Sequence, residues 1–266
     1  MIKNIWRFRL SIIPGSVISI AFLALAFGVF YILFLNSGYD AFSSALISPR
    51  VAGLIKFTIF QAFLSTLISI VIGILLAWSL AHQSKFRGRN FLVALLSSSL
   101  VLPTLIVVFG IISVLGHNGW INRLLLYLFD FSFQNSIYGL SGILIAHVYL
   151  NASFSTRSLL HVFESIPKER YKLAKSLNFS ITKRFLLIEL PAIKPSIKSI
   201  SATIFLLCFT SFAIVLTLGG SPSYNTLEVA IYEAVRLDFD IPLALKLALI
   251  QLSITMFWYF YLQTSR

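Results

Sequence analysis

The chain alternates long apolar stretches with short polar segments. Six stretches contain few charged side chains, and each is long enough for a transmembrane helix, which needs about 20 mainly apolar residues. The pattern predicts an all-α protein, a polytopic transmembrane helical bundle formed by residues 1–266 as a single domain. The predicted spans are about 12–35, 54–81, 91–115, 138–158, 197–218 and 241–262.

The first apolar stretch could also be a secretory signal peptide, because Lys3, Arg7 and Arg9 precede it without an acid. The stretch is longer than the apolar core of a signal peptide and lacks a small-residue cleavage site. We therefore predict that residues 12–35 are a retained first span.

The longest water-compatible segment runs from residue 164 to residue 195. Pro167 can begin a helix, because its missing N–H would be unpaired in a first turn. Asn178 is expected to end that helix, since asparagine tolerates the left-handed conformation that closes helices. Ser180 is a good N-cap for a second helix. The segment is thus predicted to form two short amphipathic helices and a tight bend, a rigid projection for a cytoplasmic partner.

Apolar residues recur at helical spacing in both of these short helices. We expect the second helix to stop at Pro191 and Pro195, because proline disfavours helix in the preceding residue and has no N–H to donate. The apolar positions are Tyr171, Leu173, Ala174 and Leu177 in the first helix and Ile181, Phe185 and Ile188 in the second.

Composition supports a membrane protein. Of the 266 residues, 58% are hydrophobic and 11% charged, and the mean hydropathy is +0.91. A soluble globular protein has about 25% charged residues. The net charge of +12 does not indicate nucleic-acid binding, because the basic residues cluster between apolar spans. The one cysteine, Cys208, lies in an apolar run and makes no disulfide framework or thiolate metal site.

Charge also predicts the orientation, because cytoplasmic loops of membrane proteins are enriched in Lys and Arg. Nine basic residues and three acids lie between Arg157 and Lys198. Of the 21 basic residues, 16 fall at the N-terminus, in residues 82–90, around segment 164–195 and at Arg266. Six spans with both termini cytoplasmic satisfy this bias, whereas an odd number of spans would not.

Several spans carry polar residues or helix breakers. A proline inside a span is tolerated where neighbours or a polar cavity satisfy the freed backbone group, and buried polar groups are usually functional or bond neighbouring helices. An ordinary kink and interhelical bonding are the alternatives to a functional role. By position and polarity, the candidate translocation pathway contains Pro103, Asn151, Thr210 and Ser211.

Ala174, Ile188, Leu190 and Pro191 match a known signature at its spacing: Glu-Ala-Ala, three residues, Gly, nine residues, then Ile-x-Leu-Pro. On these residues the chain resembles the permease subunits of binding-protein-dependent ABC importers. Asn178 stands at the glycine position, and Lys172 and Leu173 replace Glu and Ala. The resemblance implies that this loop docks into a groove of an ATPase subunit. The implied coupling residues are Pro167, Lys172, Leu173, Ala174, Asn178, Ile188, Leu190 and Pro191.

Other stretches resemble the N-terminal half of bacterial thiamine ABC transporter permeases. They are QAFLSTLIS from Gln61, LPTLIVVFGIISVLGHNGW from Leu102, YGLSGILIAHVYLN from Tyr138 and LCFTSFAIVLTLGGSPSYNTLEVAIYEA from Leu207. The resemblance implies a bacterial inner-membrane permease that takes thiamine or thiamine phosphates from a periplasmic binding protein. Ferric-iron, polyamine and sulfate permeases share the layout and remain alternatives.

The resemblance also implies partners. ATP would be bound and hydrolysed by an ABC ATPase dimer, so this chain needs no cofactor of its own. Thiamine permeases usually carry two such halves in one polypeptide, whereas this chain has one half and no internal repeat. We expect a half-length or fragmentary permease that pairs with a second copy of itself or with a separate half.

No enzymatic motif is present in the sequence. The phosphate-binding pattern G-x-x-x-x-G-K-[ST] is absent, and the four histidines show no metal-ligand spacing. We predict no catalytic residue and no metal site. An ion-gradient transporter is a more distant alternative, but it would need acids inside the spans, and all nine acids fall in loops or at span ends.

Overall fold

Every regular element in the described part of the chain is a helix, which confirms the all-α prediction. The computed structural model describes residues 16–25, 27–28, 31–32, 34–35, 48–83, 86–99, 101–130, 137–220 and 223–264. Residues 1–15 and 265–266 lie outside this part, so the cytoplasmic location of both termini stays a prediction.

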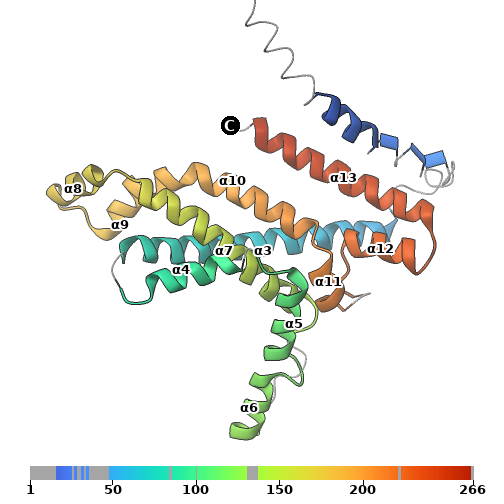
Figure 1. Ribbon diagram of the computed structural model, residues 1–266, viewed down its shortest axis with the longest axis horizontal. Coiled ribbons are helices and arrows are strands. Elements are labelled where there is room, and N and C mark those ends of the chain that lie inside the picture. The colour runs from blue at the N-terminus through green and yellow to red at the C-terminus, as the bar shows by residue number, and fades with distance from the viewer. Residues whose placement is uncertain are drawn as a thin grey trace, which may run out of the picture.

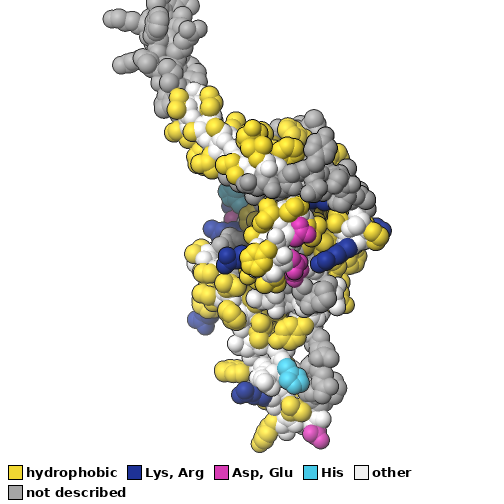
Figure 2. All heavy atoms as spheres, turned by 90° about the vertical axis from the view of Figure 1, so that its right-hand side faces the viewer, with side chains coloured by type: hydrophobic (Ala, Val, Ile, Leu, Met, Phe, Trp, Pro, Cys, Tyr) yellow, Lys and Arg dark blue, Asp and Glu magenta, His cyan; other side chains and the backbone are white. Residues whose placement is uncertain are grey.

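Four helical stretches in the described residues are long and apolar enough to cross a membrane. Apolar side chains also cover much of the face shown in Figure 2. The six predicted spans all contain helix where they are described, but the number of membrane crossings stays a prediction. The four stretches are Pro49–His82, Thr104–Phe129, Ile181–Phe209 and Ile241–Phe260, and Ser16–Leu25 is a shorter apolar helix.

Three long helices form the centre of the molecule: α3 (Pro49–His82), α7 (Leu140–Ser165) and α10 (Leu190–Phe209). They run side by side in Figure 1 and contact one another. Lipid is as apolar as this core, so close packing holds such helices together in a membrane more than removal from water does. The fully buried apolar residues in the core include Ala62, Ala77, Leu159, Ile193, Ile204 and Phe209.

Helix α7 corresponds to the predicted fourth span, and it is more polar than the four apolar stretches. Its polar side chains His147, Asn151 and Ser155 are buried. Because these groups face neighbouring helices, the helix buries them without exposing them to lipid. The low hydropathy of α7 therefore reflects its central position.

The prediction of one kinked helix over residues 91–115 is wrong. The structure has two helices there, α4 (Arg89–Ser98) and α5 (Thr104–Leu115). Pro103 lies directly before α5 with φ −56° and ψ 131°, which is outside the helical region. The helix breaks because proline excludes the preceding residue from the helical conformation and donates no hydrogen bond.

The segment between the third and fourth predicted spans contains a further helix, α6 (Trp120–Phe129). Asn122 Nδ2 donates to the carbonyl oxygen of Gly116 at 2.8 Å, which ties the new helix to the end of α5. In Figure 1, α5 and α6 extend away from the three central helices.

The predicted fifth span is also discontinuous. Helix α10 ends at Phe209, and α11 (Ala213–Leu218) follows after a short irregular segment. The Thr210 hydroxyl donates to the carbonyl oxygen of Leu206 at 2.9 Å, a local bond that competes with helix continuation. Helix α11 packs against α5, so the two discontinuous spans touch. Their shared core contains Val108, Ile143, Ile214, Val215 and Leu218.

Side-chain contacts join distant parts of the chain at the two ends of the molecule. Near one end, the Thr58 hydroxyl of α3 accepts a bond from the N–H of Leu227 at 3.0 Å, at the start of α12 (Leu227–Arg236). Helix α13 (Ile241–Thr264) follows α12 and packs against it. At the other end, residue 82 contacts the 164–195 segment, and both were predicted to be cytoplasmic. Two regions predicted to be cytoplasmic therefore lie together, and the side of the membrane that they face stays a prediction.

Candidate functional site

Segment 164–195 folds as two short helices and a tight bend, as predicted. The helices are α8 (Lys168–Ser176) and α9 (Ile181–Arg184). Asn178 has φ 49°, and the next N–H, that of Phe179, donates to the carbonyl oxygen of Ala174 at 2.9 Å. The Ser180 hydroxyl accepts from the N–H of Lys183 at 3.3 Å. The left-handed conformation of Asn178 thus closes the bend, and the Ser180 N-cap begins the second helix.

The prediction that Pro191 and Pro195 stop the second helix is wrong. Helix α9 passes into the π-helical segment η1 (Phe185–Glu189), which passes directly into α10. In η1, the N–H of Leu190 donates to the carbonyl oxygen of Phe185, five residues earlier. Pro191 then occupies the first turn of α10, where no N–H is needed, and Pro195 is accommodated inside the helix.

The first short helix turns one side inward and one side outward. Ala174 is 3% exposed, and Tyr171 packs against the core formed by α3, α7 and α10. By contrast, Leu173, Leu177 and Ile181 are 61%, 57% and 64% exposed. We call these three residues the docking surface. An exposed apolar patch on a segment with many charged residues is typical of a protein contact site.

The remaining predicted coupling residues surround the docking surface or connect it to the bundle. Lys172 and Asn178 are exposed, as are Pro167 and Pro191. Ile188 and Leu190 are half-buried and pack against the central core. The predicted set therefore divides into residues that face outward and residues that hold the segment in place.

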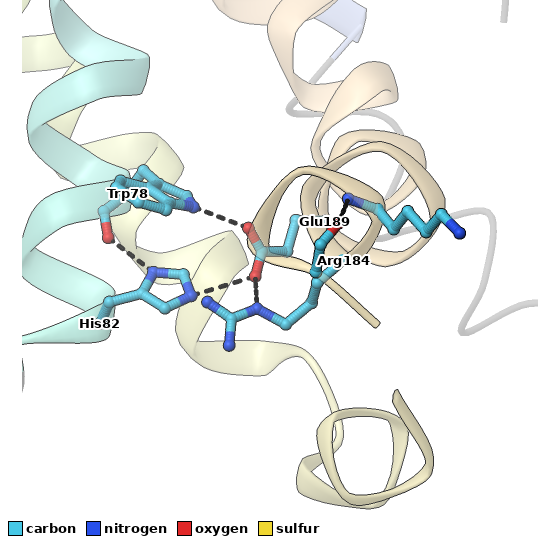
Figure 3. Close-up of polar contacts among 6 residues, drawn as sticks. Trp78, His82, Arg184 and Glu189 are labelled. Atoms are coloured by element: carbon cyan, nitrogen blue, oxygen red, sulfur yellow. Dashed lines mark hydrogen bonds and ion pairs between the residues drawn. The ribbon is translucent and has the colours of Figure 1, made fainter. Parts of the chain in front are cut away.

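Sequence reasoning missed a polar cluster that joins this segment to α3. Glu189 is fully buried at the end of η1. Its Oε2 accepts a hydrogen bond from Trp78 Nε1 at 2.8 Å, and its Oε1 lies 3.0 Å from His82 Nε2 and 3.2 Å from Arg184 Nε. Figure 3 shows the Trp78, His82 and Arg184 side chains converging on the carboxylate. We call these four residues the Glu189 cluster.

His82 contacts two different acceptor groups through its ring. Its Nδ1 lies 2.9 Å from the carbonyl oxygen of Trp78, which can only accept a hydrogen bond. Its Nε2 faces the Glu189 carboxylate, which accepts as well when ionised. Both ring nitrogens of His82 therefore have a partner within hydrogen-bond distance. The Arg184 guanidinium supplies a positive charge beside the buried carboxylate.

Tyr171 of α8 borders the same cluster. Its ring lies 5.7 Å below the Arg184 guanidinium and 6.3 Å from the His82 ring. Burial and the Glu189 charge raise the pKa of the Tyr171 hydroxyl above its usual value of 10.0. The phenol therefore stays neutral beside the carboxylate. Trp78, His82 and Tyr171 form a continuous aromatic contact between α3 and α8.

One sequence signal could have identified the cluster. Glu189 interrupts the apolar run FLLIEL, and an acid within an apolar stretch needs a buried partner. The partners could not be named from the sequence, because Trp78 lies 111 residues away and His82 lies 107 residues away.

The predicted pathway residues lie in two connected regions. Asn151 is buried, and its Nδ2 donates to Cys208 Sγ at 3.2 Å. Thr210 and Ser211 form the break between α10 and α11, and the N–H of Ser211 donates to the carbonyl oxygen of Cys208 at 3.4 Å. Cys208 thus links three of the four residues. Pro103 lies at the other helix break, on the span whose helix α5 packs against α11.

A line of polar contacts crosses the packed helices near Cys208. Gln61 Nε2 donates to the Cys208 carbonyl oxygen at 2.9 Å, and the Ser65 hydroxyl lies 3.1 Å from His147 Nδ1. These bonds join α3 to α7 and α10 inside the bundle. In the described residues, no group of three or more His, Cys, Asp or Glu side chains could hold a metal ion.

The model of one protein family matches most of the chain. Residues 69–264 match the binding-protein-dependent transport system inner membrane component. The matched region contains the Glu189 cluster, the docking surface and the pathway candidates.

Two curated relatives show different degrees of similarity. The thiamine transport system permease protein ThiP of Haemophilus influenzae is 40% identical over 238 residues, which is 89% of this chain and 44% of that protein. The sulfate transport system permease protein CysT of Salmonella typhimurium is 27% identical over 218 residues, 82% of this chain and 77% of CysT. The chain spans less than half the length of the ThiP protein that it matches.

Solved structures share the fold. A chain from a bacterial ABC transporter that imports the acidic polysaccharide alginate superimposes with a TM-score of 0.81 at 19% identity, covering 99% of this chain and 97% of that one. A chain from the alginate transporter in complex with its pentasaccharide-bound periplasmic protein gives a TM-score of 0.82 at 18% identity, covering 98% and 94%.

Proposed function

Because this chain belongs to the family of binding-protein-dependent transport system inner membrane components, we propose that it is one permease half of an ABC importer for thiamine or thiamine phosphates. In this proposal a periplasmic binding protein delivers the substrate, and ATP hydrolysis on a separate ATPase dimer drives transport. A second permease half, either another copy or a separate chain, completes the pathway.

The docking surface is the observation that carries the coupling part of this proposal. Leu173, Leu177 and Ile181 are each more than half exposed, although Ala174 and Tyr171 on the same segment pack inward. An apolar residue that is exposed on a rigid, charged segment gains most when a partner buries it. We infer that the ATPase covers these three side chains and that the inward side chains hold the segment against the bundle.

Thiamine is proposed as the substrate because of sequence similarity to the curated relatives. The ThiP protein is 40% identical and CysT is 27% identical, so the chain is more similar to the thiamine permease. Thiamine is a cationic aromatic molecule and sulfate is an anion. The two substrates therefore make opposite predictions about charge on the outer side of the pathway.

Acidic side chains are visible at the α12 end of the molecule in Figure 2. Four acids lie in or beside α12, and two of them have structural contacts. Asp240 Oδ1 accepts from the N–H of Leu243 at 2.9 Å, and Glu233 Oε2 accepts from Asn225 Nδ2 at 2.6 Å. Glu228 and Asp238 are the remaining two acids.

The pathway is proposed to run beside the two helix breaks. Discontinuous helices in transporters expose backbone groups where a substrate is bound, and the two broken spans of this chain pack against each other through α5 and α11. Pro103, Thr210 and Ser211 lie at these breaks, and Asn151 contacts Cys208 beside the break at Thr210 and Ser211. Their direct contact with substrate is part of the proposal.

Uptake of labelled thiamine tests the function. A permease-deficient strain would carry the cognate binding protein and ATPase and would express this chain alone or together with a second permease half. We expect uptake in at least one of these two strains. Uptake of sulfate or ferric iron without uptake of thiamine would show that thiamine is not the substrate. Transport that continues without the ATPase would overturn the ABC mechanism.

The charge of Lys172 allows a test of the docking contact. We expect Lys172→Glu to change the affinity for the native ATPase roughly three- to tenfold at low salt, because it reverses an exposed charge beside the docking surface. The difference should shrink at high salt, where exposed charges are screened. Association can be measured by titrating the solubilised complex. The same change at exposed Lys194 on α10 is the matched control and should have no effect.

A further inference from the structure

Glu189 connects two parts of the molecule that are distant in sequence. The docking surface lies on α8 and α9, whereas Trp78 and His82 belong to the end of α3. The Glu189 carboxylate contacts both of these α3 side chains and Arg184 at the end of α9. A displacement of α9 therefore changes the position of a group that is bonded directly to α3.

The Glu189 carboxylate is buried, so it needs these particular partners. An ionised carboxylate without partners is too costly to bury, so a fully buried Glu189 depends on its hydrogen bonds with Trp78 and His82 and on its ion pair with Arg184. Removing one of these partners weakens the compensation of the charge, and moving the carboxylate away breaks several contacts together. Such a cluster favours one discrete arrangement over intermediate ones, as a two-state coupling element requires.

The backbone at Glu189 is also unusual. It is the last residue of the π-helical segment η1, which lies between α9 and α10. Single π-helical turns inside longer helices occur frequently at functional sites. Here the π turn ends at the residue that carries the buried carboxylate, so the backbone irregularity and the charged contact coincide.

We propose that Glu189 is a positioning residue that passes movement of α8 and α9 to α3 during ATP-driven transport. This inference depends on the proposed function, because it assumes that an ATPase moves the docking surface. Glu189 does not contact the ATPase in this account. It acts through Trp78 and His82, and its loss should leave docking intact.

The test compares Glu189→Gln with the wild-type chain in the assembled transporter. The amide keeps the size of the side chain and can still accept from Trp78, but it carries no charge for His82 and Arg184. We expect normal co-purification of the ATPase, continued ATP hydrolysis, and about a tenfold fall in thiamine transported per ATP hydrolysed. A residue with only a structural role would lower the amount of complex without changing this ratio.

Two further variants complete the experiment. Glu164→Gln removes the acid of another ion pair, 2.6 Å from Arg89, that joins α7 to α4 and involves neither α8 nor α9, and it should leave the ratio unchanged. His82→Gln should reduce the ratio, and the double variant with Glu189→Gln should be no worse than Glu189→Gln alone, since both residues belong to one unit. If the Glu189→Gln complex does not assemble, the amount of thiamine transported per ATP hydrolysed is measured in His82→Gln instead.

The outcomes separate the two proposals. A wild-type complex that binds the ATPase but takes up no thiamine contradicts the proposed substrate, and the ratio is then measured with the sulfate or ferric-iron substrate found in its place. A transporting wild-type complex whose ratio is unchanged in Glu189→Gln or in His82→Gln overturns the positioning role alone.

Discussion

We expect the Gly73→Ala variant to lose about 2 kcal/mol of stability and to unfold roughly 4–8 °C below the wild-type chain. Gly73 lies in α3 where it meets α7, and an added Cβ would collide with the Ser155 side chain. It would lie 2.5 Å from Ser155 Cβ and 3.2 Å from the Ser155 carbonyl carbon. A hydroxyl could rotate away, but these two carbons cannot move without separating the helices. The clash therefore outweighs the gain of about 1 kcal/mol in helix propensity.

Two controls isolate the packing effect. Gly53 lies in the same helix with nothing within 4 Å of its added Cβ, so Gly53→Ala should leave the unfolding temperature unchanged or raise it slightly. Adding Ser155→Gly to Gly73→Ala should restore most of the loss. The measurement is the apparent unfolding temperature of the purified protein in detergent at one scan rate. An equal effect of both alanine substitutions would contradict the close α3–α7 contact.

The second large effect concerns the docking surface. We expect the double variant Leu173→Asp and Leu177→Asp to weaken ATPase association at least 100-fold. Burying each leucine contributes about 1.5–3 kcal/mol, and a loss of about 3 kcal/mol corresponds to roughly two orders of magnitude in affinity. Both side chains are more than half exposed in the free chain, so folding should be unaffected.

Co-purification of the ATPase from detergent extracts measures this association. Leu237→Asp is the matched control, because Leu237 is 65% exposed and follows α12, at the opposite end of the bundle. It should retain the ATPase fully. Retention of the ATPase by the double variant, with normal yield, would show that the docking surface lies elsewhere.

Local rules predicted the coupling segment well. Asn178 adopts the left-handed conformation and Ser180 caps the next helix, because both properties depend on one residue and its immediate neighbours. These features need no knowledge of the rest of the chain. Helical spacing alone did not separate the buried Ala174 from the exposed Leu173 and Leu177, which it grouped on one apolar face.

The errors arose where tertiary contacts decide the conformation. Pro191 was expected to stop a helix, but the π turn at Phe185–Glu189 allows the chain to continue into α10 and directs Glu189 inward. The breaks near Pro103 and Thr210 divide spans that hydropathy alone describes as continuous. Hydropathy averages over a window, so it records how apolar a stretch is and not where its helix ends.

The Glu189 cluster could not be predicted for a different reason. Its members come from α3, α9 and η1, and their approach depends on how α3 packs beside α10. The same holds for Gly73 and Ser155, whose contact joins α3 to α7. A single sequence shows that such residues are unusual but does not show which ones meet.

The central claim is that the α8–α9 surface docks the ATPase, and a crosslink tests it most directly. The one natural cysteine, Cys208, is buried, so a cysteine introduced at Leu177 can be labelled selectively with a thiol-to-amine crosslinker. We predict that Leu177→Cys forms a covalent product with the ATPase in membranes and that Leu237→Cys forms none. Absence of the ATPase from the Leu177→Cys product, or equal products from both positions, would contradict the account.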